Sequence, residues 1–275
     1  MTAGKHQKVK SFYLHKKYGG NEPLSASIPS ATEKILILCR AIPEESRKYF
    51  KTVCVAGITD KGELRRLYPV IFKPFQPGGG IPFHKKEWIS ASTSAPEDRR
   101  DTRRESRRVD ISSVRILSRE DDNRIREIIT KHLYPSVKAI EDNGATLGLI
   151  RPRILDFDCQ VDDTDQWDKS QVDLYGRPIG KIKLGQESKY EFVCAERKKC
   201  CAKRPHCISI HDWEINELYR HIIEKDRKPV VIKQKMRQKW FDWMKMERDV
   251  YFVMGTHHRW KTWMIVSVLY LAKRS

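Results

Sequence analysis

The sequence predicts an α+β protein of mostly antiparallel, β-barrel-like sheets, with a few short helices and a cysteine-rich metal knuckle. Short apolar runs rich in β-branched residues, at 34–39 and 52–58, are typical of strands. A Thr-Asp-Lys-Gly turn at 59–62 joins the second run to an apolar stretch at 64–71, which predicts a hairpin. Residues 153–161 alternate apolar and polar side chains, which is the pattern of a half-buried strand.

The remaining strands are expected at further short apolar stretches. These are residues 88–89, 181–185, 189–194, 230–232, 250–254 and 263–271. The last two flank a Gly-Thr-His-His-Arg-Trp-Lys segment and are predicted to form a closing hairpin. Many short strands with few helices between them favour antiparallel sheets over a parallel α/β fold.

Helices are predicted where a capping residue precedes apolar residues at helical spacing. Ser118 precedes an acidic turn and an isoleucine-rich pattern, and Ser136 can cap a second, shorter helix. A third helix is expected over 209–224, where Ser209 is followed by an acid at capping-box spacing. A short aromatic helix is expected over 238–248.

Changes in composition divide the chain into three parts. Residues 1–32 are polar and are predicted to form a flexible basic tail. Residues 33–110 are predicted to be a β-rich domain that ends in an exposed, arginine-rich segment. Residues 111–275 are predicted to be an α+β domain that contains the cysteine cluster and the closing hairpin.

The net charge of +18 is unevenly distributed along the chain. Residues 1–110 carry +10, residues 111–195 carry −2 and residues 196–275 carry +10. Two basic ends around a nearly neutral middle predict one basic face, or two arms, for a polyanion, because phosphate backbones attract such surfaces through counterion release. A generally basic surface without a polyanionic partner is the alternative.

Four cysteines, Cys194, Cys200, Cys201 and Cys207, fall within 14 residues, and His206 is a nearby nitrogen donor. Thiolates bind zinc and iron, and a structural site takes four donors from a short segment. The cluster therefore predicts a metal site, with zinc as the first choice and an iron–sulfur cluster as the second. Reduced thiols that cluster by coincidence are the alternative.

Basic side chains interleaved with aromatic rings predict contacts to nucleic acid, since phosphates attract cations and bases stack on rings. The predicted nucleic-acid-binding residues are Arg99, Arg100, Arg103, Arg104, Arg107, Arg108, Lys198, Lys199, Lys203, Arg204, Lys235, Arg237, Lys239, His257, His258, Arg259, Trp260 and Lys261. On a helix, the arginine run at 99–108 would form one basic stripe, and a solvated, salt-bridged helix is the alternative. Trp240 and Trp243 are expected to pack on the core.

A weaker pattern points to catalysis. Asp156 and Asp158 lie on one predicted strand, and Glu187 and Lys189 lie near another. Two carboxylates that hold Mg²⁺ beside a lysine are the outline of a metal-dependent nuclease site. Glu-x-Lys is common in charged proteins, so a solvated strand face explains the same residues.

No apolar run approaches the roughly 20 residues that span a bilayer. No apolar segment follows the N-terminal lysines, so a secretory signal is not predicted. An odd number of cysteines in such a chain fits thiols and metal rather than a disulfide framework. We therefore expect a cytoplasmic protein with no membrane partner.

Several stretches of the chain together resemble a known group of sequences. They are Val-Cys-Val-Ala-Gly-Ile at 53–58, Arg-Leu-Tyr-Pro-Val at 66–70, Thr-Leu-Gly-Leu-Ile-Arg-Pro at 146–152, His-Asp-Trp-Glu at 211–214 and Tyr-Phe-Val-Met-Gly-Thr-His at 251–257. The chain resembles a family of uncharacterised bacterial and archaeal proteins over residues 34–271. The resemblance implies a shared fold and a microbial cytoplasmic setting, and it implies no reaction.

Together these patterns favour a protein that binds DNA or RNA and contains a structural, zinc-type cysteine cluster. One alternative is an enzyme acting on nucleic acid, either a Mg²⁺-dependent nuclease or a modifying enzyme. The other is a basic subunit of a larger assembly, docked on an acidic protein partner.

Overall fold

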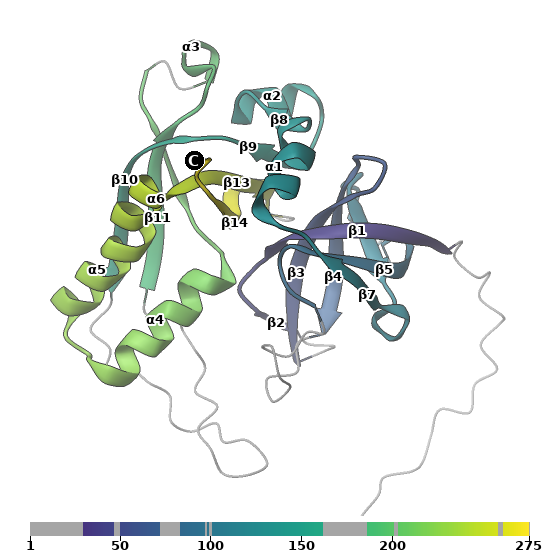
Figure 1. The fold of residues 1–275 in the computed structure, drawn as a ribbon, viewed down its shortest axis with the longest axis horizontal. Helices are drawn as coiled ribbons and strands as arrows, with labels where there is room; N and C mark the ends of the chain where they lie inside the picture. Colours follow the sequence, from purple (N-terminus) through teal and green to yellow (C-terminus); the bar gives the residue numbers. More distant parts are fainter. Residues whose placement is uncertain are drawn as a thin grey trace, which may run out of the picture.

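The computed structural model describes residues 30–46, 50–71, 83–96, 98, 101–161, 186–200, 203–257 and 261–274 (Figure 1). Most of the predicted tail and the predicted strand at 181–185 lie outside these residues. The first strand already begins at Ser30, inside the segment predicted as tail. The described residues form an α+β fold dominated by antiparallel strands, which confirms the predicted fold class.

The first half of the chain forms a closed, five-stranded barrel. Its strands are β1 (Ser30–Arg40), β3 (Phe50–Thr59), β4 (Leu64–Ile71), β5 (Glu87–Ser94) and β6 (Ser106–Val109). They pair in the order β1-β3-β4-β6-β5, and β5 closes the circuit on β1. The predicted hairpin is the β3–β4 pair. Two short strands, β2 (Glu44–Ser46) and β7 (Arg115–Arg119), pair with β3 and β5 outside the circuit.

Numbered along the chain, the barrel strands follow the circuit 1-2-3-5-4-1, and the third and fifth strands are the parallel pair. A five-stranded Greek-key barrel with this connectivity is an OB-fold. The inward side chains of the strands fill the barrel with a small apolar core, which includes Ile35, Val53 and Leu67. Alternate side chains of each strand point outward, so the same strands present a second face.

The second half of the chain traces the same circuit. Its strands are β8 (Leu133–Tyr134), β9 (Leu147–Ile150), β10 (Arg153–Val161), β11 (Gln186–Val193), β12 (His206–Ser209), β13 (Arg248–Thr256) and β14 (Trp263–Ala272). β10 pairs with β11 and β11 with β12, while β13 pairs with both β9 and β14. A parallel bridge between Ile210 and Ile265 connects β12 to β14. With β9 and β10 counted as one bent strand, the two halves share one topology, although no repeat is visible in the sequence.

Helices occupy the connections between strands, mostly in the second half (Figure 1). They are η1 (Ile111–Ser113), α1 (Asp122–Thr130), α2 (Val137–Asp142), α3 (Arg197–Cys200), α4 (Trp213–Lys225), α5 (Pro229–Arg237), the π-helix η2 (Gln238–Trp243) and α6 (Met244–Glu247). The run from α4 to α6 joins β12 to β13, the place where an OB-type barrel connects its third and fourth strands.

The predicted caps are correct in one helix and displaced in two. The hydroxyl of Ser136 caps α2, as predicted. Asp121 rather than Ser118 caps α1, because Ser118 belongs to β7. Asp212 rather than Ser209 caps α4, because Ser209 is the last residue of β12. In both cases the serine belongs to a strand, and the aspartate three positions later accepts the free N–H groups of the helix.

Two predicted elements are wrong. The expected strand at 230–232 is the first turn of α5, which Pro229 starts at a position where its missing N–H costs nothing. The expected helical stripe and exposed linker at 99–108 contain strand β6, and Glu105 and Ser106 are buried there. Tertiary pairing with β4 and β5 decides this segment, since its local sequence has no apolar period.

A shared apolar layer joins the two halves. Outward side chains of β1 and β3, among them Leu36, Leu38 and Ile58, pack in one cluster with Leu149 of β9 and Val253 of β13. The second half therefore covers much of this outer barrel face. The sheet of the first half continues through β7, past residue 110, where a domain boundary was predicted.

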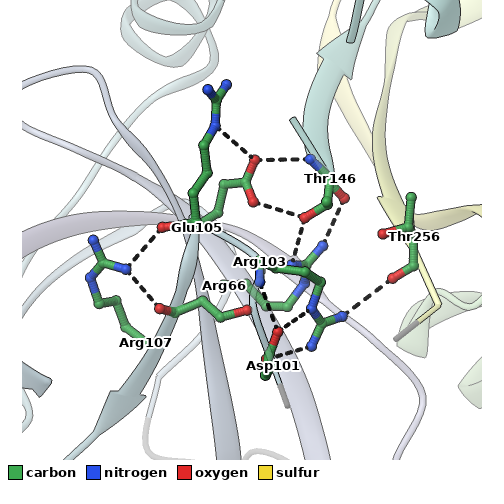
Figure 2. A network of polar contacts seen from close by, with 9 residues as sticks. Arg66, Asp101, Arg103, Glu105, Arg107, Thr146 and Thr256 are labelled. Carbon is green, nitrogen blue, oxygen red and sulfur yellow. Dashed lines mark hydrogen bonds and ion pairs between the residues drawn. The ribbon is translucent and has the colours of Figure 1, made fainter. Parts of the chain in front are cut away.

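A polar network lies beside this layer (Figure 2). Glu105, which precedes β6, accepts hydrogen bonds from the N–H of Thr146 (2.9 Å) and from its hydroxyl (2.8 Å). Arg66 of β4 donates to the Thr146 carbonyl at 2.8 Å. Arg103 donates to the carbonyl of Thr256 at 3.3 Å. The arginine-rich segment thus connects the first barrel to strands of the second half through hydrogen bonds.

We expect the hydrogen bonds between Glu105 and Thr146 to weaken in acid. Burial opposes ionisation of Glu105, but the hydrogen bonds from Thr146 outweigh it and hold the pKa below its usual value of 4.5. The ionised Glu105 carboxylate therefore stabilises the folded protein in full above about pH 4.5. This contribution is lost as the pH falls through the lower pKa that Glu105 has in the folded state. Glu105→Gln should lower the free energy of unfolding by about 1–3 kcal/mol at neutral pH, and the stability of the variant should depend less on pH in the acid range. Melting temperatures measured against pH test it, and parallel curves for both proteins would contradict it.

Candidate functional site

Cys194, Cys200 and His206 form a compact group of metal-ligand atoms. Their sulfur and imidazole nitrogen atoms all lie within 4.8 Å of one another. The two sulfurs are 3.7 Å apart, and Cys200 Sγ is 3.1 Å from His206 Nε2. Two thiolates on one tetrahedral zinc ion, with bonds of about 2.3 Å, lie about 3.8 Å apart. The group can therefore hold a metal ion.

Strand pairing brings these donors together. Cys194 follows the last residue of β11, His206 opens β12 on the neighbouring strand, and Cys200 ends α3 between them. The backbone N–H of Lys138 in α2 donates to Cys200 Sγ at 3.5 Å. Burial lowers the pKa of His206, which favours the neutral imidazole that binds metals.

The structure changes the predicted ligand set at one position. Neighbouring side chains of a strand point to opposite faces, so Cys207 faces away from His206, and it is exposed. Cys201 lies outside the described residues. Within the part of the chain that the structure describes, the metal-ligand group is a Cys₂His set.

A cleft of about 630 Å³ opens where β4 and β6 meet the second half. We call it the arginine cleft, because Arg104 and Arg107 of the predicted arginine run line it with Arg65, Lys131 and His132. The side chain of Arg104 is 56% exposed. The guanidinium of Arg107 is held in place through two backbone carbonyls, at 2.7 and 2.9 Å (Figure 2).

The arginine cleft lies beside the base of the closing hairpin. Thr146, next to two residues of the cleft, accepts a hydrogen bond from the N–H of Thr256 at 3.0 Å. Arg103 donates to Thr256 from the other side. His257 follows directly, and Lys261 is exposed two residues before β14 begins. The arginine-rich segment and the C-terminal hairpin, both predicted to be basic contact regions, therefore meet here.

The other predicted nucleic-acid-binding residues are spread over the molecule. Exposed on described elements are Arg108, Lys198, Lys199, Lys203, Arg204, Lys235 and Arg237. Outside the described residues are Arg99, Arg100, His258, Arg259 and Trp260. Arg103 departs from the prediction, because its guanidinium is bound inside the polar network at 2.7 Å from Asp101. A phosphate would have to displace these internal partners.

Lys239 and Arg248 lie against the ring of Trp243, at 3.2 and 4.4 Å from its centroid. Burial and the charge of Arg248 lower the pKa of Lys239, so the two cations repel one another. Trp243 is half-buried, whereas Trp240 lies in the core, as predicted. This cation–aromatic cluster has the composition that single bases and phosphates contact in many proteins.

The predicted nuclease residues lie on the outer face of the β10–β11 pair. Lys189 is opposite Asp158 in the register, and its Nζ is 3.2 Å from Glu187. Asp156 pairs with Arg237 at 2.7 Å. Among the described residues these carboxylates do not form a metal-ligand group of three. The magnesium site therefore stays a prediction.

The structure also contains a cavity of about 430 Å³ between the halves, which no sequence pattern predicted. At its base the Nζ atom of Lys85 is 2.7 Å from Asp212 and 3.3 Å from Glu214. Asp212 also accepts hydrogen bonds from the hydroxyl of Ser267 and from the N–H of Val268. Lys85 and Asp212 are buried, and such charges persist only when paired. The one signal in the sequence was the His-Asp-Trp-Glu motif at 211–214.

The walls of this junction cavity combine cations with flat rings. Arg40 of β1 lies 5.2 Å from the ring centroid of Trp213, and Lys86 lies 5.8 Å from that of Tyr270. Arg119 of β7 completes the basic side. Burial opposes the charge of Lys85, but the carboxylates of Asp212 and Glu214 outweigh it and raise the pKa of Lys85. The ammonium therefore stays charged at neutral pH.

Two families of proteins match this chain. Residues 130–275 match DUF8757, a domain of unknown function, and residues 31–132 match DUF8758, a second domain of unknown function. The chain belongs to the DUF8757 family. No curated protein matches the chain. The resemblance to an uncharacterised family is thereby confirmed, while its bacterial or archaeal origin stays a prediction.

The two matches meet at residues 130–132, directly after α1. The DUF8757 match therefore contains the second strand circuit, the Cys₂His group and Asp212, whereas the DUF8758 match contains the first barrel and most cations of both cavities. Among the described residues, no helix is long and apolar enough to cross a membrane.

Proposed function

We propose that this protein binds nucleic acid through the arginine cleft and that its Cys₂His group holds a structural zinc ion. The observation that carries the first part is the gathering of cations in one cleft, which lies beside the base of the closing hairpin. Arg104 and Arg107 come from the arginine run, and Lys131 directly follows α1. Such a cluster of cations contacts successive phosphates and releases their counterions.

The acids of the cleft do not cancel this charge in full. Glu63 pairs with Arg65 at 2.6 Å, and Arg65 is also bound by Glu33 at 2.7 Å. Glu105 is turned to Thr146, with Arg104 at 3.5 Å. Arg107 and Lys131 remain as cations that these acids do not engage among the described residues.

The barrel supports the proposal by analogy of fold. OB-type barrels bind oligonucleotides over the face of their second and third strands and with the loop between the fourth and fifth. Here the loop between β5 and β6 carries the arginine run. The outer side of β3 is largely covered by the second half, so that loop and the adjacent cleft are the accessible part.

The second part of the proposal rests on the donor set. Two thiolates and one imidazole supply three of the four donors of a tetrahedral structural zinc site, and zinc needs no redox partner. The fourth predicted donor, Cys201, lies outside the described residues. The cations Arg197, Lys198 and Lys199 of α3 offset the negative charge of the thiolates.

We expect a fluorescent oligonucleotide to bind with an affinity that falls steeply between about 50 and 200 mM salt. Arg104→Ala should weaken binding and reduce the logarithmic salt slope by about 0.7–0.9, the amount for one phosphate contact. Fluorescence anisotropy titrations at several salt concentrations measure both quantities.

Arg227→Ala is the matched control, because Arg227 is exposed between α4 and α5 and lines neither cavity. It removes the same charge and should leave the slope unchanged. Absence of binding to DNA and RNA at low salt, or equal effects of both substitutions, would refute the arginine cleft as the binding surface.

A further inference from the structure

We propose that the junction cavity is a binding site for a phosphorylated nucleoside. The proposal goes beyond the proposed function, because it concerns a separate cavity and does not need the arginine cleft to bind anything. It follows from the size of the cavity, from the cations on one side, and from the rings and a carboxylate acceptor on the other.

The cavity has the size and position of a small-molecule site. Its volume of about 430 Å³ lies in the roughly 300–1,000 Å³ range of such sites. Its walls come from β1, β7 and the segment before β5 in the first half, and from α4 and β14 in the second. Sites of this kind occur preferentially where two domains meet.

The base of the cavity is rigid. The Nζ atom of Lys85 donates to Asp212 Oδ2 at 2.7 Å and to the carbonyl of Val268 at 3.3 Å, and Glu214 Oε1 lies 3.3 Å away as a second ion-pair partner. Lys85 is therefore a structural cation. It links α4 and β14 to the first barrel and so keeps the distance between the two walls of the cavity constant.

The basic wall suits a phosphate. Arg119 is 61% exposed, and its nearest acid, Glu87, is 3.6 Å away, too far for a close ion pair. Lys86 has a backbone φ of 72°, the left-handed region that a lysine rarely adopts. Its N–H and carbonyl are fixed by hydrogen bonds of 2.8 Å to Ile37 and Glu120. The Lys86 side chain pairs with Asp122, 2.6 Å from its Nζ atom, so Arg119 is the cation of this wall that a phosphate contacts first.

The opposite wall suits a base. The guanidinium of Arg40 and the ring of Trp213 lie together as flat groups on which a base can stack. Glu214 contacts Lys85 through Oε1, and the hydroxyl of Tyr270 hydrogen-bonds to the same carboxylate. A carboxylate accepts several donors, so it can also accept from the amino group of a base or from a ribose hydroxyl.

The shared chemistry, a phosphate beside a stacked base, can come from a free nucleotide or from one nucleotide of a strand. The probes are the four ribonucleoside monophosphates, the matching nucleosides, inorganic phosphate and a short single-stranded oligonucleotide. Isothermal titration calorimetry with the full chain should show a monophosphate binding at least about tenfold more tightly than its nucleoside or phosphate.

Arg119→Ala and Trp213→Leu should each weaken that binding about tenfold or more, and Trp213→Phe should restore much of it. The matched controls, Arg227→Ala and Trp263→Leu, lie outside the cavity and should bind as the wild type. Each variant is compared only if its melting temperature without ligand matches that of the wild type, and Arg119→Ala, at an exposed residue, meets this condition most readily.

If monophosphates do not bind but the cavity variants weaken the oligonucleotide, the occupant is a nucleotide within a strand. If phosphate alone binds as tightly as any monophosphate, or if cavity variants and controls behave alike with every probe, the proposal is overturned. The proposed function is judged separately, by Arg104→Ala.

Discussion

Asp212→Ala is expected to destabilise the protein by about 3–5 kcal/mol, because it leaves the ammonium of Lys85 buried without its closest partner. The carboxylate of Asp212 has no solvent exposure, and it accepts hydrogen bonds from two residues of β14 as well as from Lys85. Its other oxygen caps α4 through the N–H of Glu214 at 2.7 Å. Urea unfolding followed by circular dichroism measures the loss.

Asp121→Ala isolates the capping part of this effect. Asp121 caps α1 in the same way but is exposed and has no buried cation, so its loss should cost about 0.5–2 kcal/mol. In the double variant Lys85→Met with Asp212→Asn, part of the stability should return, because no charge then remains buried and unpaired. Equal costs for Asp212→Ala and Asp121→Ala would show that the ion pair does not hold the halves together.

Cys200→Ala is expected to abolish metal binding. The purified wild type should contain about one zinc ion per chain, and the variant almost none, because one of three donors is lost. A chelator should lower the melting temperature of the wild type and leave that of the variant unchanged, since metal binding contributes to folding free energy. Elemental analysis by mass spectrometry identifies the ion and its stoichiometry.

Cys207→Ala is the matched control for this prediction. It removes a thiol only seven residues away, but one that points to the opposite face of β12, so the metal content should not change. Loss of metal in both variants would show that Cys207 is a ligand after all. Retention in both would remove the Cys₂His group as the site.

The barrel strands could be predicted because their local patterns are strong. The β3–β4 hairpin follows from two apolar runs and a Gly62 turn, and β10 follows from strict alternation at 153–161. The prediction of a strand at 230–232 was wrong, because three consecutive apolar residues suit either a strand or a buried helical turn. The arginine run also misled, because β6 is held by its neighbours rather than by its own residues.

Of the candidate sites, the sequence predicted the one whose residues are close together in the chain and missed the one whose residues are far apart. Cys194, Cys200 and His206 are close in the chain, so their spacing alone predicted a metal group. Spacing could not predict whether Cys207 belongs to this group, because that depends on which face of β12 its side chain occupies. Lys85 and Asp212 are 127 positions apart, so no local pattern pairs them.

By itself, the sequence determined the fold class, the basic charge of both ends and a thiol-rich group of metal-ligand residues, because each depends on composition or on residues within one short segment. Only the tertiary structure decided that the strands close into two circuits of one topology and that the arginine run meets the closing hairpin. It also decided that a buried ion pair fixes a cavity between the halves. The reason is that contacts between distant residues depend on strand order and register, which the packing of the whole chain selects.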